Sequence, residues 1–287
     1  MKYISFIVIM MLSCTMLVAQ EKRALLIGIG DYPHTSGWST IHGHNDVKII
    51  HEALIEQGFH ENNISKLIDS SAIYVNIVKA LQTLLNESNK GDVVYIQFSG
   101  HGQRITDQDG DEEDGYDESW VPYDAHKSYV KGEYEGERHI TDDFLYDYLT
   151  KLRTKVGANG KIVVIADACH SGSGSRTYED DDVFKRGSTE KFIIPSASCN
   201  LRRKDKPVDW LFVAACKSYQ TNYEYKDEHG NYYGSLSYCI SKSNDQLANA
   251  SYLEAVGIWS SNMQEIISYP QDIDSEGRPS KKSSNLF

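Results

Sequence analysis

Asp92-Val-Val-Tyr-Ile-Gln-Phe-Ser-Gly-His-Gly102 and Lys161-Ile-Val-Val-Ile-Ala-Asp-Ala-Cys-His-Ser-Gly172 are two apolar stretches, and each ends in small residues beside a reactive side chain. Runs of this length, rich in β-branched residues, are typical of strands buried on both faces of a parallel sheet. Such sheets bind ligands outside the carboxyl ends of their strands. We therefore expect His101 and Cys169 to meet at one edge of the sheet, where a histidine can activate a cysteine nucleophile.

The rest of the chain alternates between strand and helix patterns. Strands are expected at 23–30, 64–68 and 210–216, and helices at 74–87, at 141–153 and from Asn45 to Gly58. A further helix begins at the capping box Ser251-Tyr-Leu-Glu254. This alternation predicts an α/β fold with a mostly parallel sheet flanked by helices.

Composition and charge narrow the class of protein. The 287 residues carry a formal net charge of −12, which argues against nucleic acid and anionic membranes as partners. The excess of acidic over basic residues is compatible with cationic substrates or with a bound divalent metal. We expect a single domain at residues 20–287, because α/β sheets of this size commonly form one core.

The first residues resemble a secretory signal peptide. Residues 1–19 contain one positive charge, an apolar stretch and a small residue at Ala19, after which cleavage is expected. A membrane anchor is a rival interpretation, but the apolar stretch is short for a span. Lipid attachment at Cys14 is a second rival, although Met11-Leu-Ser-Cys14 matches the acceptor pattern poorly. We expect an exported protein, periplasmic or secreted, with no peripheral membrane association after removal of the signal.

A long polar segment separates the Cys169 strand from the next apolar run. Residues 171–207 are rich in Ser, Gly, Asp, Lys and Arg, which is typical of an exposed loop. Loops of this length are usually functional or disordered. The remaining cysteines form no Cys-x-x-Cys pair, and Cys216 and Cys239 lie in apolar stretches where buried thiols are expected.

Several ordered motifs resemble those of caspase-type cysteine peptidases, and most of all the metacaspases and bacterial metacaspase-like proteins. Ser99-Gly-His-Gly102 is similar to the histidine motif of that family, and Asp167-Ala-Cys-His-Ser-Gly172 is similar to its nucleophile motif. The stretch Ala215-Cys-Lys-Ser-Tyr-Gln-Thr-Asn-Tyr-Glu224 agrees as well. The resemblance implies a caspase-hemoglobinase-like three-layer sandwich with about six strands. It also implies a large segment at about 20–175 and a small segment at about 208–287.

The resemblance further implies a reaction. Cys169 would attack the amide as nucleophile and His101 would act as the acid/base, with no third orienting side chain and no cofactor required for the chemistry. The backbone N–H groups of Cys169 and Gly102 would stabilise the oxyanion, as acyl transfer requires. The chain is thus expected to be a cysteine-type endopeptidase, a hydrolase acting in proteolysis.

Two acidic residues match positions that hold a basic side chain in metacaspases. Asp46 and Asp167 are expected to bind the Arg or Lys that precedes the scissile bond of a peptide or protein substrate. Asp46 alone would equally suit the first turn of a helix, where the helix dipole favours an acid. Asp167 has less reason to be at a buried strand end, because an unpaired buried carboxylate is costly.

An enzyme that cleaves after Arg or Lys would find substrates in its own loop. We expect maturation of a zymogen by cleavage within 171–207, although ordinary solvation of a surface loop explains the basic composition equally well. The candidate positions are Arg176, Lys185, Arg186, Arg202, Arg203 and Lys204.

An acidic run follows His101 closely. Residues 107–118 contain many carboxylates, which are ligands that calcium prefers, but the glycine and flanking helices of an EF-hand are missing. The resemblance instead implies an activating calcium site that joins part of this run to the start of the next helix. Its candidate ligands are Asp114, Asp117, Asp142 and Asp143, of which the last two equally suit a first helical turn.

Two other functions remain open for the same residues. The dyad could transfer the acyl group to an amine, as an acyltransferase or transpeptidase does. A non-catalytic caspase-like domain could bind peptides only, but it would not need both dyad residues and both pocket acids.

Overall fold

The computed structural model describes residues 20–287 except 111, 170–182, 196–207, 248 and 278–284. The centre of the described part is a six-stranded sheet with the order β11-β8-β7-β3-β1-β2. All neighbouring strands run parallel except β11, which pairs antiparallel with β8 at one edge. The strands are β1 (Lys22–Gly28), β2 (Ile64–Ile68), β3 (Val93–Ser99), β7 (Lys161–Asp167), β8 (Leu211–Ala214) and β11 (Asp274–Glu276). The predicted mostly parallel sheet of about six strands is confirmed.

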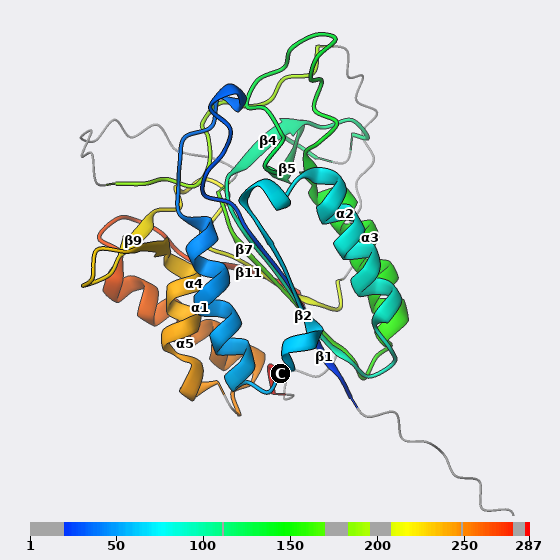
Figure 1. The fold of residues 1–287 in the computed structure, drawn as a ribbon, viewed down its shortest axis with the longest axis vertical. Coiled ribbons are helices and arrows are strands. Elements are labelled where there is room, and N and C mark those ends of the chain that lie inside the picture. The colour runs from blue at the N-terminus through cyan, green and yellow to red at the C-terminus, as the bar shows by residue number, and fades with distance from the viewer. Residues whose placement is uncertain (1–19, 111, 170–182, 196–207, 248, 278–284) are drawn as a thin grey trace, which may run out of the picture.

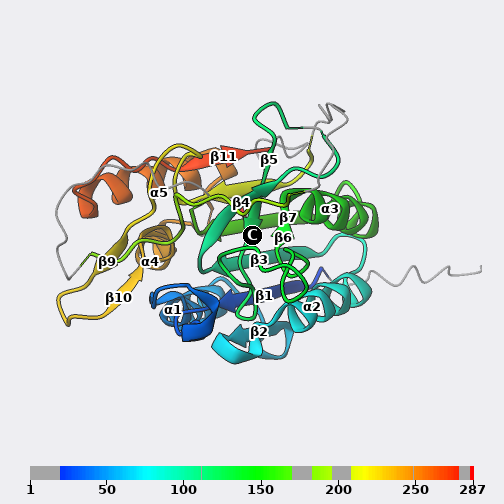
Figure 2. The same ribbon diagram turned by 90° about the horizontal axis from the view of Figure 1, so that it is seen from above.

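Helices cover both faces of this sheet and give three layers (Figures 1 and 2). One face carries α1 (Gly43–Glu56), α4 (Ser235–Lys242) and α5 (Tyr252–Ile266), and the other carries α2 (Tyr74–Glu87) and α3 (Asp142–Val156). Alternate residues of the strands enter two separate apolar cores, because successive side chains of a strand point to opposite faces. Ile96 of β3 packs toward α2 and α3, whereas Tyr95 packs toward α1 and α4. The expected three-layer α/β sandwich is confirmed.

Smaller elements surround the carboxyl ends of the central strands. A second sheet contains β4 (Gly102–Thr106), β5 (Tyr116–Trp120) and β6 (Ile140–Thr141). A hairpin of β9 (Glu224–Lys226) and β10 (Tyr232–Gly234) lies beside α1 and α4. Short 3-10 helices occupy His34–Ser36, Glu61–Asn63, Asp69–Ser71 and Asn244–Gln246. Among the described residues, none of the helices has the length and apolar character needed to cross a membrane.

One local expectation, the start of the first helix, is wrong, and the expected exposed loop is partly buried where the structure describes it. Helix α1 begins at Gly43 after the N-cap residue His42, and Asn45 lies inside it and donates to the Tyr232 carbonyl oxygen. The described part of the expected exposed loop, residues 183–195, packs against the molecule. Phe192 exchanges backbone hydrogen bonds with Arg104 and Thr106 at β4, and both Phe192 and Arg186 are fully buried. The polar composition of residues 171–207 predicts an exposed loop. Within the described part, buried and exposed residues alternate because the segment pairs with neighbouring parts of the chain.

Candidate active site

The register of β3 and β7 places His101 opposite Cys169. Ser99 pairs with Asp167 at the carboxyl ends of these neighbouring parallel strands, and His101 and Cys169 each follow two residues later. The Gly100 amide donates to the Asp167 carbonyl oxygen at 3.3 Å, which continues the pairing past the last strand residues. Both side chains are buried, with exposed fractions of 1% each. The two reactive side chains therefore lie at the same edge of the sheet, as the sequence predicted.

The His101 ring is fixed by three neighbours. Its Nε2 lies 2.9 Å from the Ser39 carbonyl oxygen, which can only accept, so this nitrogen carries the proton. The ring stacks on Trp38 with centroids 4.7 Å apart and packs against Tyr32 at 5.0 Å. The Tyr32 hydroxyl accepts from the His101 amide at 3.0 Å. These contacts leave Nδ1 as the unprotonated ring nitrogen.

Nδ1 of His101 is buried and has no hydrogen-bond partner among the described residues. Burial lowers the pKa of His101 to about 4, against which the hydrogen bond to Ser39 acts only weakly. The imidazole is therefore neutral at pH 7, with a free lone pair on Nδ1. A neutral imidazole in a water-poor site is the form needed for a general base.

The Cys169 thiol has a second cysteine beside it. Its Sγ donates to the Gln220 carbonyl oxygen at 2.9 Å, and Cys216 Sγ lies 3.6 Å from the same oxygen. The hydrogen bond to Cys169, together with burial, raises the pKa of Cys216 well above its usual value. Cys216 is therefore a protonated neighbour, and Cys216 and Cys239 are free buried thiols as expected.

A pocket of three carboxylates surrounds the guanidinium group of Arg186. Arg186 Nη1 lies 2.6 Å from Asp46 Oδ2 and 3.5 Å from Asp167 Oδ1, and Nη2 lies 2.9 Å from Glu224 Oε1. None of these four side chains has exposed surface. The structure thus brings Asp46 and Asp167 together and adds Glu224 to them.

Both predicted acids also have partners within the protein. Asp167 accepts from Asn222 Nδ2 at 2.8 Å and from the amide and hydroxyl of Ser237 at 2.8 and 2.7 Å. Asp46 accepts from the Gly234 amide at 2.9 Å. Asp167 is therefore not an unpaired buried carboxylate, because these donors and the Arg186 guanidinium hold its oxygens in place. Their rigidity fixes the oxygens that face the guanidinium.

The charges in this pocket influence one another strongly. Burial raises the pKa of Asp46, and the guanidinium of Arg186 opposes that rise. Burial acts in the same direction on Glu224, but the charge of Arg186 and the hydrogen bonds from His42 outweigh it and hold the pKa of Glu224 below its usual value. The three carboxylates raise the pKa of Arg186 despite its burial. The three carboxylates therefore stabilise a cation, and that cation in turn helps to keep the carboxylates ionised.

Residues 184–187 cross the site and pair with residues on two sides through isolated bridges. The Arg186 amide donates to the Asn222 carbonyl oxygen and the Glu224 amide donates to the Phe184 carbonyl oxygen, both at 3.0 Å. Lys185 pairs antiparallel with Tyr223, and Gly187 bridges to Cys169. Arg186 is buried while Lys185 is exposed. The bridge therefore brings Gly187 and the peptide bond before it beside Cys169, with the Arg186 side chain among the carboxylates.

The other candidate cleavage positions are placed differently. Lys185 is described, but its side chain lies over the Tyr223 ring with its nitrogen 5.8 Å from the centroid. Arg176, Arg202, Arg203 and Lys204 lie outside the described residues. The expected oxyanion donor Gly102 begins β4, directly after His101, and pairs with Trp120.

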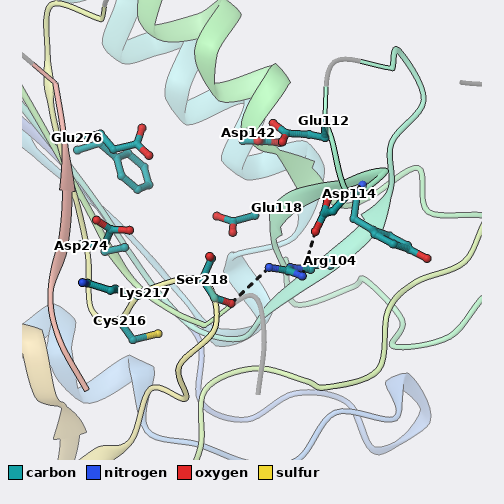
Figure 3. A pocket seen from close by; sticks show the side chains of 13 residues that line it. Arg104, Glu112, Asp114, Glu118, Asp142, Cys216, Lys217, Ser218, Asp274 and Glu276 are labelled. Atoms are coloured by element: carbon teal, nitrogen blue, oxygen red, sulfur yellow. Dashed lines mark hydrogen bonds and ion pairs between the residues drawn. The ribbon is translucent and has the colours of Figure 1, made fainter. Parts of the chain in front are cut away.

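Two of the four expected calcium ligands, Asp114 and Asp142, line an acidic cavity of about 370 Å³, whereas Asp117 and Asp143 do not (Figure 3). Asp142 lies on its wall, and burial together with the charges of Asp117 and Glu118 raises the pKa of Asp142 to about 8. Asp114 lines the same cavity and forms an ion pair with Arg104 at 3.1 Å, whereas Asp143 is a neighbouring charge. No three metal-ligating side chains of the described residues converge as they would around a metal ion.

Glu224 and Ser39 belong to the site, although the sequence interpretation assigned neither of them a role. Glu224 lies in a stretch that carried the family resemblance, so its acidic side chain was a usable signal. Ser39 acts through its carbonyl oxygen, and no side-chain pattern predicts that contact. Cys216 likewise was expected to be buried, but its position beside Cys169 follows only from the pairing of β7 with β8.

Fold and site together define a caspase-like α/β protein with a histidine and a cysteine just after the ends of two neighbouring parallel strands. A family model described as metacaspase, peptidase C14 domain, matches residues 22–176. The chain belongs to this family of cysteine-type peptidases.

Individual relatives agree with this assignment. Metacaspase III c of Phaeodactylum tricornutum is 38% identical over 53% of this chain and 43% of its own length. Metacaspase-7 of Arabidopsis thaliana is 37% identical over 53% of this chain and 35% of its own length. Metacaspase-1 of Candida albicans is 26% identical over 86% of this chain, and the match spans 62% of that protein. The matches thus span about a third to two thirds of these relatives.

The fold has a counterpart among solved structures. A crystal structure of a protein from Geobacter sulfurreducens superposes with a TM-score of 0.62 at 19% identity. The match covers 90% of this chain and 94% of that chain. At this identity the likeness concerns the fold alone.

Proposed function

We propose that this protein is a cysteine endopeptidase that cleaves peptides after Arg or Lys with His101 and Cys169. The observation that carries the proposal is the buried Arg186 side chain among Asp46, Asp167 and Glu224, with its peptide bond at the nucleophile. A guanidinium group beside several carboxylates forms strong charge-assisted hydrogen bonds. Aspartate at this position would instead bring a fourth negative charge into a buried acidic pocket.

The chemistry follows from the protonation states in the site. Nδ1 of the neutral His101 accepts the thiol proton, and the Cys169 thiolate attacks the carbonyl carbon of the scissile bond. The amides of Cys169 and Gly102 stabilise the oxyanion. The His101 imidazolium then protonates the leaving amine, and the acyl-enzyme is hydrolysed by a water molecule that gives its proton to the same nitrogen. The Ser39 carbonyl oxygen holds the ring in one orientation throughout.

The same site processes its own chain between Arg186 and Gly187. Gly187 supports this position because a Cβ there would lie 2.2 Å from the Cys169 carbonyl oxygen, so the residue after the cleaved bond must be small to pass this closely. Cleavage leaves β7 and β8 on different segments that remain paired in one sheet. The uncleaved zymogen keeps Arg186 in the pocket that a substrate needs.

Export and calcium stimulation are parts of the same proposal. Residues 1–19 direct export and are removed after Ala19, which gives a periplasmic or secreted enzyme. Calcium binds in the acidic cavity near Asp142, whose Oδ1 is buried and has no hydrogen-bond partner among the described residues. Carboxylate oxygens are the ligands that calcium prefers, and a divalent cation would offset the charge gathered there.

A substrate panel tests the proposal directly. Peptides with Arg, Lys or Asp before the scissile amide are incubated with wild type and with Cys169→Ala, with calcium or with a chelator. We expect turnover of the Arg and Lys peptides by wild type only. Turnover of the Asp peptide alone would overturn the pocket assignment, and equal rates with and without chelator would remove calcium from the proposal. A band pattern that is identical in wild type and Cys169→Ala would exclude self-processing.

A further inference from the structure

Beside the arginine site, the Phe184 ring packs against the rings of His42 and Tyr232, which stack on each other and form an aromatic pocket. Phe184 meets the His42 ring edge-on, with centroids 4.5 Å apart and an interplanar angle of 89°. It meets the Tyr232 ring at 4.8 Å and 72°. His42 and Tyr232 themselves stack at 4.8 Å and 19°. An edge-to-face arrangement with both walls is a favourable geometry for aromatic rings.

The two walls of this pocket are fixed by other contacts. The His42 amide donates to Glu224 Oε1 at 2.7 Å, and His42 Nδ1 lies 2.6 Å from Glu224 Oε2. The Tyr232 carbonyl oxygen accepts from Asn45 in α1 at 2.9 Å. Glu224 thus touches both the arginine and the wall of the aromatic pocket. The pocket is therefore part of the site's rigid frame.

Phe184 stands two residues before Arg186 in the segment that pairs with residues 222–224. Its ring contacts His42 and Tyr232 while the Arg186 guanidinium contacts Asp46 and Glu224, so the two side chains occupy their sites together. Lys185 between them points outward and is exposed. The side chains of Phe184 and Arg186 therefore each occupy a binding pocket, whereas the position of Lys185 between them accepts different side chains.

We propose that His42 and Tyr232 form a second specificity pocket, which selects substrates with an aromatic residue two positions before the cleaved Arg or Lys. The inference rests on the proposed endopeptidase function and adds an extended preference of the form aromatic-any-basic. The ligand is the side chain of an aromatic residue in an extended peptide. Binding joins main-chain pairing along residues 222–224 with ring contacts in the pocket.

The test compares four peptide substrates with the sequence X-Lys-Arg before a fluorogenic amine, where X is Phe, Tyr, Leu or Ala. The full chain is used after self-processing. The ratio of kcat/KM values between two peptides is independent of how much enzyme has a free site, because that fraction scales both values equally. We expect the Phe and Tyr peptides to exceed the Ala peptide by about tenfold, with Leu in between.

Variants of the hairpin locate the effect. Tyr232→Ala is expected to reduce the Phe to Ala ratio to about twofold, while Tyr232→Phe retains it. The matched control is Tyr233→Ala on the same strand, since the Tyr233 ring faces Tyr238 instead, with centroids 5.8 Å apart. Wild-type ratios near one would overturn the aromatic pocket while leaving cleavage after Arg intact. Absence of turnover for all four peptides would overturn the proposed function itself, and with it this inference.

Discussion

The guanidinium Nη1 of Arg186 lies 2.6 Å from Asp46 Oδ2, and neither side chain has exposed surface. The two residues are 140 positions apart in the sequence, so the contact ties the start of α1 to the segment that follows the nucleophile. Burying one cation among three carboxylates is tolerable only while every partner remains in place. The pocket therefore requires a cationic occupant, supplied either by this chain or by a substrate.

Replacing Arg186 should remove the cation and leave three buried carboxylates that keep only their hydrogen bonds to neutral donors and to His42. In a Cys169→Ala background, which prevents cleavage, we expect Arg186→Gln to lower the free energy of unfolding by about 3–5 kcal/mol. Urea denaturation measures this change. Lys185→Gln is the matched control and should change stability by less than about 0.5 kcal/mol, because its side chain is exposed. If both substitutions changed the free energy of unfolding equally, the buried ion pairs of Arg186 would not contribute more to stability than the exposed Lys185 side chain does.

With Cys169 intact, the same position should control the proposed self-processing. Arg186→Lys should retain cleavage before Gly187, because an ammonium group still reaches the carboxylates. It lacks only the bidentate hydrogen bonding of a guanidinium. Arg186→Gln should abolish cleavage at this bond, as followed by gel electrophoresis and mass measurement of the fragments. Continued cleavage before Gly187 in Arg186→Gln contradicts the assignment.

Removing the charge of Asp46 should weaken turnover of basic substrates. Asp46→Asn keeps an acceptor for the Gly234 amide but loses the charge that faces the guanidinium. We expect kcat/KM for an Arg peptide to fall by about 100- to 1000-fold, which corresponds to about 3–4 kcal/mol. Asp31→Asn is the matched control, since this residue is exposed, and should leave kcat/KM unchanged. Similar kinetics for the two variants would argue against Asp46 as a substrate contact.

The strands and the dyad could be predicted from the sequence because their signals are local. The apolar run before His101 and the run before Cys169 each fit one buried strand, and parallel register then brings their ends together. The strands and the positions of His101 and Cys169 needed only a short window and one rule of sheet geometry. The role expected for Asp46 and Asp167 followed instead from the resemblance to metacaspases.

The remaining parts of the site depend on contacts between distant segments. Glu224 is 182 positions from His42, and its role in linking the two pockets follows from a hairpin that no local pattern places there. The basic loop was expected to be exposed, yet Arg186 is buried because its charge is matched by residues from three other elements. The composition of the loop predicts only how exposed its residues are on average. Whether Arg186 is buried depends on three particular carboxylates elsewhere in the chain.

Acidification should destabilise the protein through His139. This ring is buried between the Tyr134 hydroxyl, 2.7 Å from Nδ1, and Gln103 Oε1, 3.1 Å from Nε2. Burial lowers the pKa of His139 to about 4 from the usual value of 6.5, so the unfolded chain binds a proton between these values that the folded chain does not. Stability from the neutral ring is complete above about pH 6.5 and falls as the pH drops toward 4, by roughly 3 kcal/mol in total.

A comparison with His139→Gln isolates this contribution from other titrating groups. Asp46 acts in the opposite direction, because its raised pKa makes the folded chain bind an extra proton in part of the same window. We expect the dependence of unfolding free energy on pH to become less steep in His139→Gln between pH 6.5 and 4. His229→Gln is the control, since the His229 side chain is 75% exposed, and should leave the slope unaltered. Parallel curves for wild type and His139→Gln would contradict the prediction.

Trp38 should act as a positioning residue for the base. Its ring stacks on His101 at an interplanar angle of 24° with the centroids 4.7 Å apart. Removing it in Trp38→Ala frees the imidazole to rotate about its remaining hydrogen bond to the Ser39 carbonyl oxygen. We expect kcat for an Arg peptide to fall by about tenfold with little change in KM, because orientation of the base matters in the transition state and not in substrate binding.

Trp38→Phe keeps an aromatic face and should recover most of kcat. A rise in KM without loss of kcat would instead place Trp38 in substrate binding, and failure of Trp38→Phe to recover kcat would contradict stacking as the cause.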